Sequence, residues 1–407
     1  MKAARFGVVL FSLALAFGQQ SSGPAGLARY GLRGGAPSAA QDGASEGVTL
    51  SSTTPRWSTN YAFTPDTGLS LHTAVFDPSM KVMVVFGGID WGAHETATNA
   101  VLLNAPANAN GSWTTLLANG AAGSPPARAG HSAVYDITNN RMTVFGGVTC
   151  LACDNPNYLN DVWVLTNANG QGGTAAWTQL SPSGTPPEPR WGHVVAYDSR
   201  HNRMIVFGGL GSVNYSDVWV LSHANGLGGN PRWTQLAPSG SPATGVGLAS
   251  AVYDQANNIF TVFGGEDIDE TGFTNGVWTL AGANGLSGTP QWTNIVADST
   301  PGSPAQRAGQ SAVYDATNDR MIIFGGLAFS GTYAGTGFND VWILSNANGL
   351  GGTPAWTQLK PSGTLPGTRS EQTAVYDAPT NRMMIFAGLN EDPVYYVVWV
   401  LSHANGL

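Results

Sequence analysis

The strongest constraint on the fold of this chain is a pair of glycines that returns at an almost constant interval. The pairs stand at positions 87-88, 146-147, 208-209, 264-265 and 325-326, and Ala387-Gly388 forms a degenerate sixth copy. Successive copies begin 56 to 62 residues apart. Self-similarity at such a period predicts either an open array of repeats or a closed propeller.

Each copy predicts the same local structure. In residues 131–147, HSAVYDITNNRMTVFGG, small and β-branched residues predict a strand, ITNNR predicts a polar turn, and MTVF predicts a second strand that ends at the glycine pair. Continuous apolar runs such as residues 204–207 indicate strands that are covered on both faces. Ala387 shows that the first glycine position accepts a Cβ atom, so the second position is the stricter one.

The rest of each repeat supplies two more strands. A loop of variable length precedes a third strand, at residues 161–165 in the second copy, and an Asn-Gly turn leads to a fourth strand around Trp177. The YDxxxNRMxVFGG core, the NDVW third strand and the fourth-strand tryptophan resemble the bacterial kelch type of β-propeller, in the galactose-oxidase-like superfamily, over about residues 51–407. The resemblance implies an all-β, six-bladed propeller of four-stranded antiparallel blades. Propellers host enzymes, lectins and scaffolds alike, so the fold does not select a function.

The count of tryptophans predicts how the ring closes. Fourth-strand tryptophans occur five times, against six glycine pairs: Trp113, Trp177, Trp233, Trp292 and Trp356. The chain ends on VWVLSHANGL, where every earlier copy continues into a fourth strand, while Trp57 stands near the start in TPRWS. We therefore expect the segment around Trp57 to be the outer strand of the last blade, whose other strands lie at about 372–402. The alternative is that the chain is a fragment of a longer array.

The N-terminal residues divide into two segments. Residues 1–18 have two basic residues followed by an apolar run, which predicts a secretory signal peptide. The alternative, a membrane anchor or a buried strand, is disfavoured because ~12 apolar residues are too few to span a bilayer. Residues 19–52 are rich in Gly, Ala and Ser and predict a flexible leader, so residues 53–407 form the propeller. We expect a secreted or periplasmic protein.

Charge and cysteine content restrict the partners and the chemistry. The formal net charge is -8 with 10% charged residues and no basic cluster, which argues against nucleic acid or a membrane surface as partners. The two cysteines, Cys150 and Cys153, lie in one CxxC segment. Export to an oxidising compartment predicts a disulfide between them, and the alternative is a metal-binding pair.

Two kinds of loop differ in how much they vary. The first-to-second and third-to-fourth turns are nearly uniform and are interpreted as scaffold, whereas the second-to-third loops vary in length and content. Function normally resides on the variable loops. Their aromatic and acidic residues suit a flat polar ligand such as a sugar, and the alternative is that they pack the loops and face solvent. The predicted binding residues here are Trp91, Tyr158, Tyr215, Tyr333, Glu266, Asp267 and Asp269.

A second candidate set is derived from the repeat. Four arginines stand seven residues before the first-strand tyrosine of their copies, while Leu69 and Val246 take that place in the other two: Arg128, Arg190, Arg307 and Arg369. Guanidinium groups gathered around an axis could hold a carboxylate ligand through paired hydrogen bonds. The favoured alternative is that each arginine bonds carbonyls of its own fourth-to-first loop.

The histidines do not predict a metal site. His72, His131 and His193 recur at one repeat position, and residues spread around a ring seldom converge on one ion. Copper-radical oxidases of the resembled superfamily need a Tyr crosslinked to Cys together with further Tyr and His ligands, a set that cannot be placed on this chain. No cofactor is therefore expected, with calcium or copper left open.

Taken together, the sequence predicts an exported, non-catalytic binding module, monomeric, that holds a protein or carbohydrate ligand on the face of the second-to-third loops. The alternative is a secreted carbohydrate-active enzyme, an oxidase or hydrolase, that uses loop carboxylates. Hydrolysis of a glycosidic bond would need two carboxyl groups roughly 5 to 9.5 Å apart across a cleft.

Overall fold

The computed structural model describes residues 54–60, 68–90, 96–104, 112–151, 153, 155–240, 242, 246–267, 272–328, 336–389 and 397–407. Contacts between Cα atoms divide the chain into two units, Met1–Thr53 and Thr54–Leu407. All of the described strands belong to the second unit.

The strands of the second unit form antiparallel sheets that we call blades 1 to 6. Blades 1 to 3 contain, from first to fourth strand, β3 (Thr73–Asp77), β4 (Val82–Phe86), β7 (Val101–Asn104) and β8 (Trp113–Leu117); β9 (Ser132–Asp136), β10 (Arg141–Val148), β11 (Tyr158–Thr166) and β12 (Ala176–Leu180); and β13 (Val194–Asp198), β14 (Arg203–Phe207), β15 (Val218–Ser222) and β16 (Arg232–Leu236).

Blades 4 to 6 repeat this order. They contain β18 (Ser250–Asp254), β19 (Ile259–Asp267), β20 (Gly272–Ala281) and β21 (Gln291–Val296), with β17 (Val246–Gly247) also paired to β19; β22 (Ser311–Asp315), β23 (Arg320–Phe324), β24 (Val341–Ser345) and β25 (Ala355–Leu359); and β26 (Thr373–Asp377), β27 (Arg382–Phe386), β28 (Val398–Ser402) and β1 (Arg56–Asn60). A small sheet joins β2 (Leu69–Ser70), β5 (Ile89–Asp90) and β6 (Thr96–Ala97), and the described residues hold one 3₁₀ turn, Ala378–Thr380.

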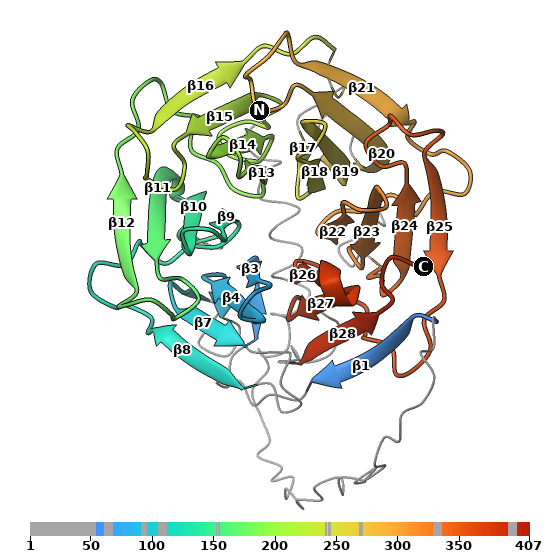
Figure 1. The fold of residues 1–407 in the computed structure, drawn as a ribbon, viewed down its shortest axis with the longest axis horizontal. Coiled ribbons are helices and arrows are strands. Elements are labelled where there is room, and N and C mark those ends of the chain that lie inside the picture. The colour runs from blue at the N-terminus through green and yellow to red at the C-terminus, as the bar shows by residue number, and fades with distance from the viewer. Residues whose placement is uncertain are drawn as a thin grey trace, which may run out of the picture. The chain divides into compact units, whose positions relative to one another are not determined.

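Figure 1 shows the blades set around a common axis, with first strands such as β9 and β13 innermost and fourth strands such as β12 and β16 at the rim. Each second strand lies between the first and third strands of its own blade, and the neighbouring blades cover both of its faces. In β14, the four residues from Met204 to Phe207 are fully buried. Their apolar run, without alternation, is thus explained by cover on both faces.

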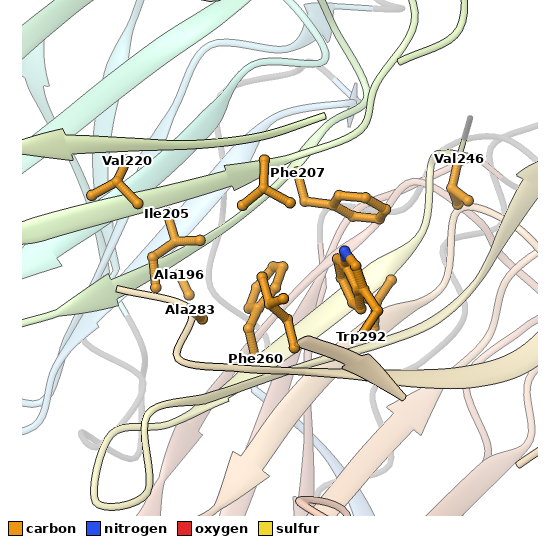
Figure 2. Close-up of a cluster of buried hydrophobic side chains, with 11 residues drawn as sticks. Ala196, Ile205, Phe207, Val220, Val246, Phe260, Ala283 and Trp292 are labelled. Carbon is orange, nitrogen blue, oxygen red and sulfur yellow. The ribbon is translucent and has the colours of Figure 1, made fainter. Parts of the chain in front are cut away.

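Aromatic contacts connect each blade to the preceding one. Every fourth-strand tryptophan packs on the second-strand phenylalanine that precedes the glycine pair, or Ala387-Gly388, of the preceding blade. The ring centroids are 4.6 to 5.4 Å apart: Trp113 on Phe386, Trp177 on Phe86, Trp233 on Phe145, Trp292 on Phe207, Trp356 on Phe263 and Trp57 on Phe324. Figure 2 shows one such contact, in which Trp292 and Phe207 lie within an apolar cluster that joins blades 3 and 4.

The outer strand of blade 6 comes from the start of the described chain. β1 pairs antiparallel with β28, and Trp57 lies opposite Leu401. Fourth-strand tryptophans of other blades have the same register, for example Trp233 opposite Leu221. The backbone N–H of Trp57 also donates at 2.9 Å to the carbonyl of Ser362, in the loop that follows the fourth strand of blade 5. The N–H of Trp233 donates in the same way to Ser183, in the loop that follows the fourth strand of blade 2. The segment around Trp57 therefore occupies the position that the count of tryptophans predicts.

The glycine pairs are explained by backbone angles and close packing. The first position has φ near +66°, a left-handed conformation that Ala387 also adopts, with φ +54°. The second has φ near +100°, as in Gly88, where a Cβ atom would lie 2.7 Å from the Cβ of His72. Only glycine accepts that combination readily, so the second position is the stricter one, as the sequence indicates.

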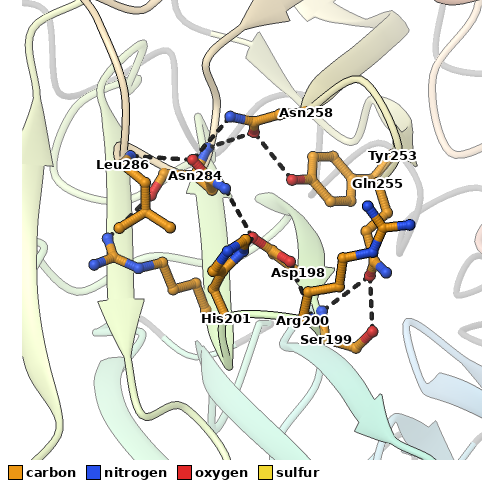
Figure 3. A network of polar contacts seen from close by, with 10 residues as sticks. Asp198, Ser199, Arg200, His201, Tyr253, Gln255, Asn258, Asn284 and Leu286 are labelled. Atoms are coloured by element: carbon orange, nitrogen blue, oxygen red, sulfur yellow. Dashed lines mark hydrogen bonds and ion pairs between the residues drawn. The ribbon is translucent and has the colours of Figure 1, made fainter.

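In an antiparallel blade, the first-to-second and third-to-fourth turns lie at the same end, which we call the turn face. On this face, an asparagine of one blade donates a hydrogen bond to the buried aspartate of the preceding blade: Asn169 to Asp77, Asn225 to Asp136, Asn284 to Asp198, Asn348 to Asp254 and Asn405 to Asp315. Between blades 1 and 6, Lys81 instead forms an ion pair with Asp377 at 2.7 Å. Figure 3 shows one of these networks, in which Asn284 links Asp198 to Asn258. These bonds explain why the turns are so uniform.

Candidate functional site

The opposite end of the blades, which we call the loop face, carries the second-to-third and fourth-to-first loops. Six residues, one from each blade, form a closed circle of backbone hydrogen bonds there. Each N–H donates to the carbonyl of the residue before it in the circle, over 2.7 to 3.2 Å: Leu71, Gly130, Gly192, Leu248, Gly309 and Glu371. All six have positive φ, between 53° and 66°. We call this circle the axial ring.

The axial ring surrounds a pocket of about 130 Å³. The remaining lining residues follow the axial ring by one position in each blade: His72, His131, His193, Ala249, Gln310 and Gln372. Five of these six side chains are polar, and all five are at least nine-tenths buried. These side chains contact the preceding blade, as Gln310 does through the carbonyl of Phe263 and His131 through the hydroxyl of Thr73.

In each of the two glutamines, Gln310 and Gln372, the amide nitrogen has hydrogen-bond partners and the amide oxygen has none among the described residues. Their Nε2 groups donate to backbone carbonyls, that of Gln310 to Phe263 at 3.0 Å and that of Gln372 to Phe324 at 2.9 Å. These bonds fix which end of each amide is the oxygen. The Oε1 atoms of both glutamines are buried and have no hydrogen-bond partner among the residues that the structure describes.

The three histidines of this set pack on phenylalanines of the preceding blades and are neutral at physiological pH. Burial lowers the pKa of His72 to about 3. Burial, together with the nearby Arg190, lowers the pKa of His193 to about 3. His131 is shifted in the same direction, first by burial and then by Arg128. The imidazoles of His72 and His131 contact threonine hydroxyls, for example Nε2 of His72 to Thr373 Oγ1 at 2.8 Å.

Glu371 is the one acidic member of the axial ring. Burial raises the pKa of its carboxyl to about 7, opposed by a hydrogen bond from Ser70. Sequence reasoning missed this residue. The signal was available, because the same repeat position holds only glycine or leucine in the other blades: Leu71, Gly130, Gly192, Leu248 and Gly309.

Glu266, which the sequence did predict, is a second acid whose pKa is raised by burial. It follows a glycine pair, a position that is aliphatic in the other copies: Ile89, Val148, Leu210, Leu327 and Leu389. The residue is 8% exposed, and burial raises the pKa of its carboxyl to about 7. Blade 4 therefore has an acid at a place that the other blades fill with an apolar side chain.

The two acids give the protein a definite pH dependence. Between pH 4.5 and 7, the carboxyls of Glu266 and Glu371 are ionised in the unfolded chain but still protonated in the folded protein. Since the folded protein binds more protons, the free energy of unfolding should fall as the pH rises through this range. We expect Glu266→Gln to be more stable than the wild type by about 3 kcal/mol at pH 8, and by little near pH 4.5. Urea unfolding at several pH values measures this, and an equal gain at both ends of the range would contradict it.

The four predicted arginines lie inside the blades. Arg128, Arg190 and Arg307 are fully buried and form two-pronged ion pairs with an aspartate at the start of the third strand of the same blade, at 2.5 to 3.0 Å: Asp161, Asp217 and Asp340. Each also donates through Nε to a carbonyl of its own fourth-to-first loop, and Arg369 donates to the carbonyls of Gly367 and Ala387.

This geometry does not fit the ligand-holding role predicted for the arginines, because the protein itself already occupies their N–H groups. It fits the alternative in which they bond their own loops. The aspartate partners were missed. The sequence contains a signal for them, because the arginine and the aspartate are lost together. The first copy has Leu69 and Ala100 at the two positions, and the fourth has Val246 and Gly276.

Three side chains of the predicted aromatic and acidic set lie in the described part of the chain: Tyr158, Tyr215 and Glu266. Tyr158 and Tyr215 lie near each other, because burial and then the charge of Tyr215 raise the pKa of Tyr158. Tyr215 is 8% exposed, and its ring stacks on the guanidinium of Arg190 at 4.0 Å. Tyr158 is half-buried at the start of β11. The backbone of Asp267 ends β19, and its side chain lies outside the described part of the chain, as do Trp91, Tyr333 and Asp269.

Cys150 and Cys153 form a disulfide. Among the described residues, no group of three or more His, Cys, Asp or Glu side chains could hold a metal ion. No helix within the same residues is long and apolar enough to cross a membrane.

Four-stranded antiparallel sheets set around an axial pocket define this chain as a β-propeller. The chain matches the family model of the KLHDC2/KLHL20/DRC7 Kelch-repeats domain over residues 32–226, 72–284 and 228–405, and it belongs to this family of kelch-repeat domains. It is 30% identical to human Host cell factor 1 over 240 residues, which cover 53% of this chain and 11% of that protein.

Other similarities agree with the family. The chain is 28% identical over 232 residues to the flagellar outer arm dynein alpha chain of Chlamydomonas reinhardtii, covering 54% of this chain and 5% of that protein. The chain thus matches only a small part of these relatives. The solved structure of YjhT aligns with a TM-score of 0.58 and 17% identity over 86% of this chain and 97% of YjhT, which shows the shared fold.

Proposed function

We propose that this chain is an exported, non-catalytic module that binds a protein on its loop face, around the axial pocket. The observation that carries the proposal is the difference between the two ends of the blades. On the turn face, buried asparagines and aspartates satisfy one another across blades. At the loop face, residues from all six blades instead surround a pocket of about 130 Å³. Export rests on the predicted signal peptide, residues 1–18.

A protein ligand fits the loop face better than a carbohydrate does. Sugar binding relies on aromatic rings that present a free face. Two aromatic residues of the described loops, Tyr215 and Phe338, instead stack at 4.0 Å on Arg190 and Arg307. Their rings stabilise the scaffold. A protein partner needs only exposed loop surface and a central anchor, which the kelch fold provides here.

A display library of random peptides tests the proposal, using a matched pair of surface variants. Val213, in the second-to-third loop of blade 3, is 53% exposed, and Ile137, in a turn at the opposite end, is 52% exposed. We expect peptides selected on the wild-type protein to bind Val213→Arg at least tenfold more weakly, because the new side chain lies on the binding surface, and to bind Ile137→Arg unchanged.

The opposite pattern would contradict the proposal. The turn face exposes aliphatic residues of its own, among them Leu350 at 64% and Leu407 at 54%, so it is a genuine competitor. Selected peptides that lose affinity only with Ile137→Arg would place binding on the turn face. Failure to select any peptide, together with capture of glycans on an array, would favour the carbohydrate ligand. Turnover of a captured glycan would favour the enzyme.

A further inference from the structure

Three of the fourth strands at the rim are covered along their outer edge by the loop of the preceding blade. A serine of that loop pairs in parallel with the first residue of the strand: Ser183 with Arg232, Ser239 with Gln291 and Ser362 with Arg56. The serine N–H donates to the carbonyl one position before that residue, and the serine carbonyl accepts from the tryptophan one position after it, over 2.8 to 3.0 Å. We call these Pro-Ser-Gly segments the edge caps: residues 182–184, 238–240 and 361–363.

The glycine of an edge cap lies directly against the strand that it covers. A Cβ atom on Gly184 would lie 2.6 Å from the carbonyl oxygen of Trp233, and one on Gly240 would lie 2.8 Å from that of Trp292. The tryptophans under the edge caps are 2 to 4% exposed: Trp57, Trp233 and Trp292. An edge cap therefore needs glycine at its third position, and it seals the tryptophan beneath it.

Two fourth strands, β12 and β25, have no edge cap, and Figure 1 shows them on opposite sides of the rim. The loops next to them, residues 118–124 and 297–303, contain no Pro-Ser-Gly sequence. Within the described residues, no backbone hydrogen bond joins either loop to its neighbouring strand. A Cβ atom on Gly120, Gly123 or Gly302 of these loops would meet nothing within 4 Å. In blade 1, the corresponding loop includes residues 61–67, which lie outside the described part of the chain.

The uncapped strands present the same backbone groups as the capped ones. Trp177 and Trp356 lie opposite Leu165 and Leu344, in the register that Trp233 has with Leu221, so their N–H groups point away from the third strand. Both tryptophans are only half-buried. The first residues of these strands are Ala176 and Ala355, whereas the capped strands begin with a long side chain: Arg56, Arg232 and Gln291. Two edges thus have the hydrogen-bonding positions of a cap without the cap.

We propose that the open edges of β12 and β25 bind an extended Pro-Ser-Gly segment of another polypeptide by parallel β-addition. The serine of the partner donates to the carbonyl of Ala175 or Pro354 and accepts from the N–H of Trp177 or Trp356. Its glycine lies against the tryptophan carbonyl. This surface is separate from the loop face, so the inference does not rest on the proposed function.

The edge caps of the chain itself define the chemistry of this partner. Main-chain hydrogen bonds supply the affinity in β-addition, and the fit of individual residues supplies the specificity. The partner must offer an N–H and a carbonyl on one residue, which a polypeptide does and a lipid head group does not. It must also carry glycine next in sequence, because a Cβ atom there would collide with the strand, as at Gly184.

NMR titration with the peptide acetyl-Ala-Pro-Ser-Gly-Thr-amide tests the proposal on the intact protein. We expect the backbone amide signals of Trp177 and Trp356 to shift on addition of the peptide, because their N–H groups gain an acceptor. The signals of Trp233 and Trp292 should not shift, because their edges are already occupied. The same molecule thus contains both the test strands and their controls. No shift at either open edge, or equal shifts at the capped edges, would overturn the proposal.

Two altered peptides separate β-addition from unspecific contact with a half-exposed indole. N-methylation of the serine removes the donated hydrogen bond and should weaken binding at least about fivefold, the usual effect of one lost hydrogen bond. Replacing the glycine by valine should weaken binding by at least as much, because the new side chain collides with the strand. Binding that survives both changes would contradict the assigned geometry. Neither control alters the protein, so neither depends on the folding of a variant.

A loop graft tests one edge against the other. Replacing residues 118–124 by a copy of residues 181–186 gives blade 1 the loop that caps β16, and this loop should cover β12. We expect the peptide to shift the signal of Trp356 as before and to leave that of Trp177 unchanged. A folded graft in which Trp177 still responds to the peptide would overturn the proposal. If the graft does not fold, the altered peptides decide the question.

Discussion

Trp57→Ala is expected to lower the free energy of unfolding by about 3 to 5 kcal/mol, the usual cost of removing a large buried aromatic side chain. Trp57 is 2% exposed and packs against Phe324 of blade 5 and Trp399 of its own blade, with ring centroids 5.4 and 6.5 Å apart. Although β1 is far from β28 in sequence, its tryptophan has the same surroundings as those of the other fourth strands.

Two matched variants make this a test of the role of β1. Trp233→Ala removes the equivalent tryptophan of blade 3, which is 3% exposed, and should cost a similar amount. Ser58→Ala changes an exposed neighbour on β1 and should change the stability by less than about 0.5 kcal/mol. Urea unfolding of the three variants gives the comparison. A small cost for Trp57→Ala beside a large one for Trp233→Ala would show that β1 is dispensable for the fold.

Asp217→Ala is the second substitution with a large expected effect, about 3 to 5 kcal/mol of destabilisation. It would leave the guanidinium of Arg190, which is fully buried, without its counter-charge. It would also remove the acceptor of the indole N–H of Trp219, which lies 2.6 Å from the carboxylate. Burying a charge without a partner is the dominant cost.

The chain itself suggests the compensating change. Blade 1 has Leu69 and Ala100 at the positions of Arg190 and Asp217. We therefore expect the double variant Arg190→Leu, Asp217→Ala to be more stable than Asp217→Ala alone, with a coupling energy of at least about 1 kcal/mol in a double-mutant cycle measured by urea unfolding. Strictly additive costs would show that the pair is not an energetic unit.

The sequence predicts much of the fold because blade geometry follows from local patterns. Apolar runs of the β14 kind predict strands covered on both faces, and the β19 and β23 copies repeat them. The position of Trp57 followed from counting tryptophans against glycine pairs. Ala387 alone indicated which glycine of a pair is essential, and its φ of +54° against φ near +100° at the second position gives the reason.

The candidate site could be predicted only in part. Glu266 was found because it lies in a variable loop with other acids, and the structure adds its burial and its raised pKa. The arginine partners lie 27 or 33 positions away along the chain, so pattern reading within one motif could not connect them. Comparing repeat positions across copies would have done so, because arginine and aspartate appear and disappear together in most copies.

By itself, the sequence determined the repeat, the strand order within a blade, the role of the second glycine and the origin of the outer strand of blade 6. All of these depend on neighbours within one repeat or on counting repeats. Only the tertiary structure decided where the polar groups go. The axial ring consists of backbone hydrogen bonds between residues from six blades, which no side-chain pattern records. The protonation of Glu371 depends on burial by residues distant in sequence, since desolvation, not the residue type, raises its pKa.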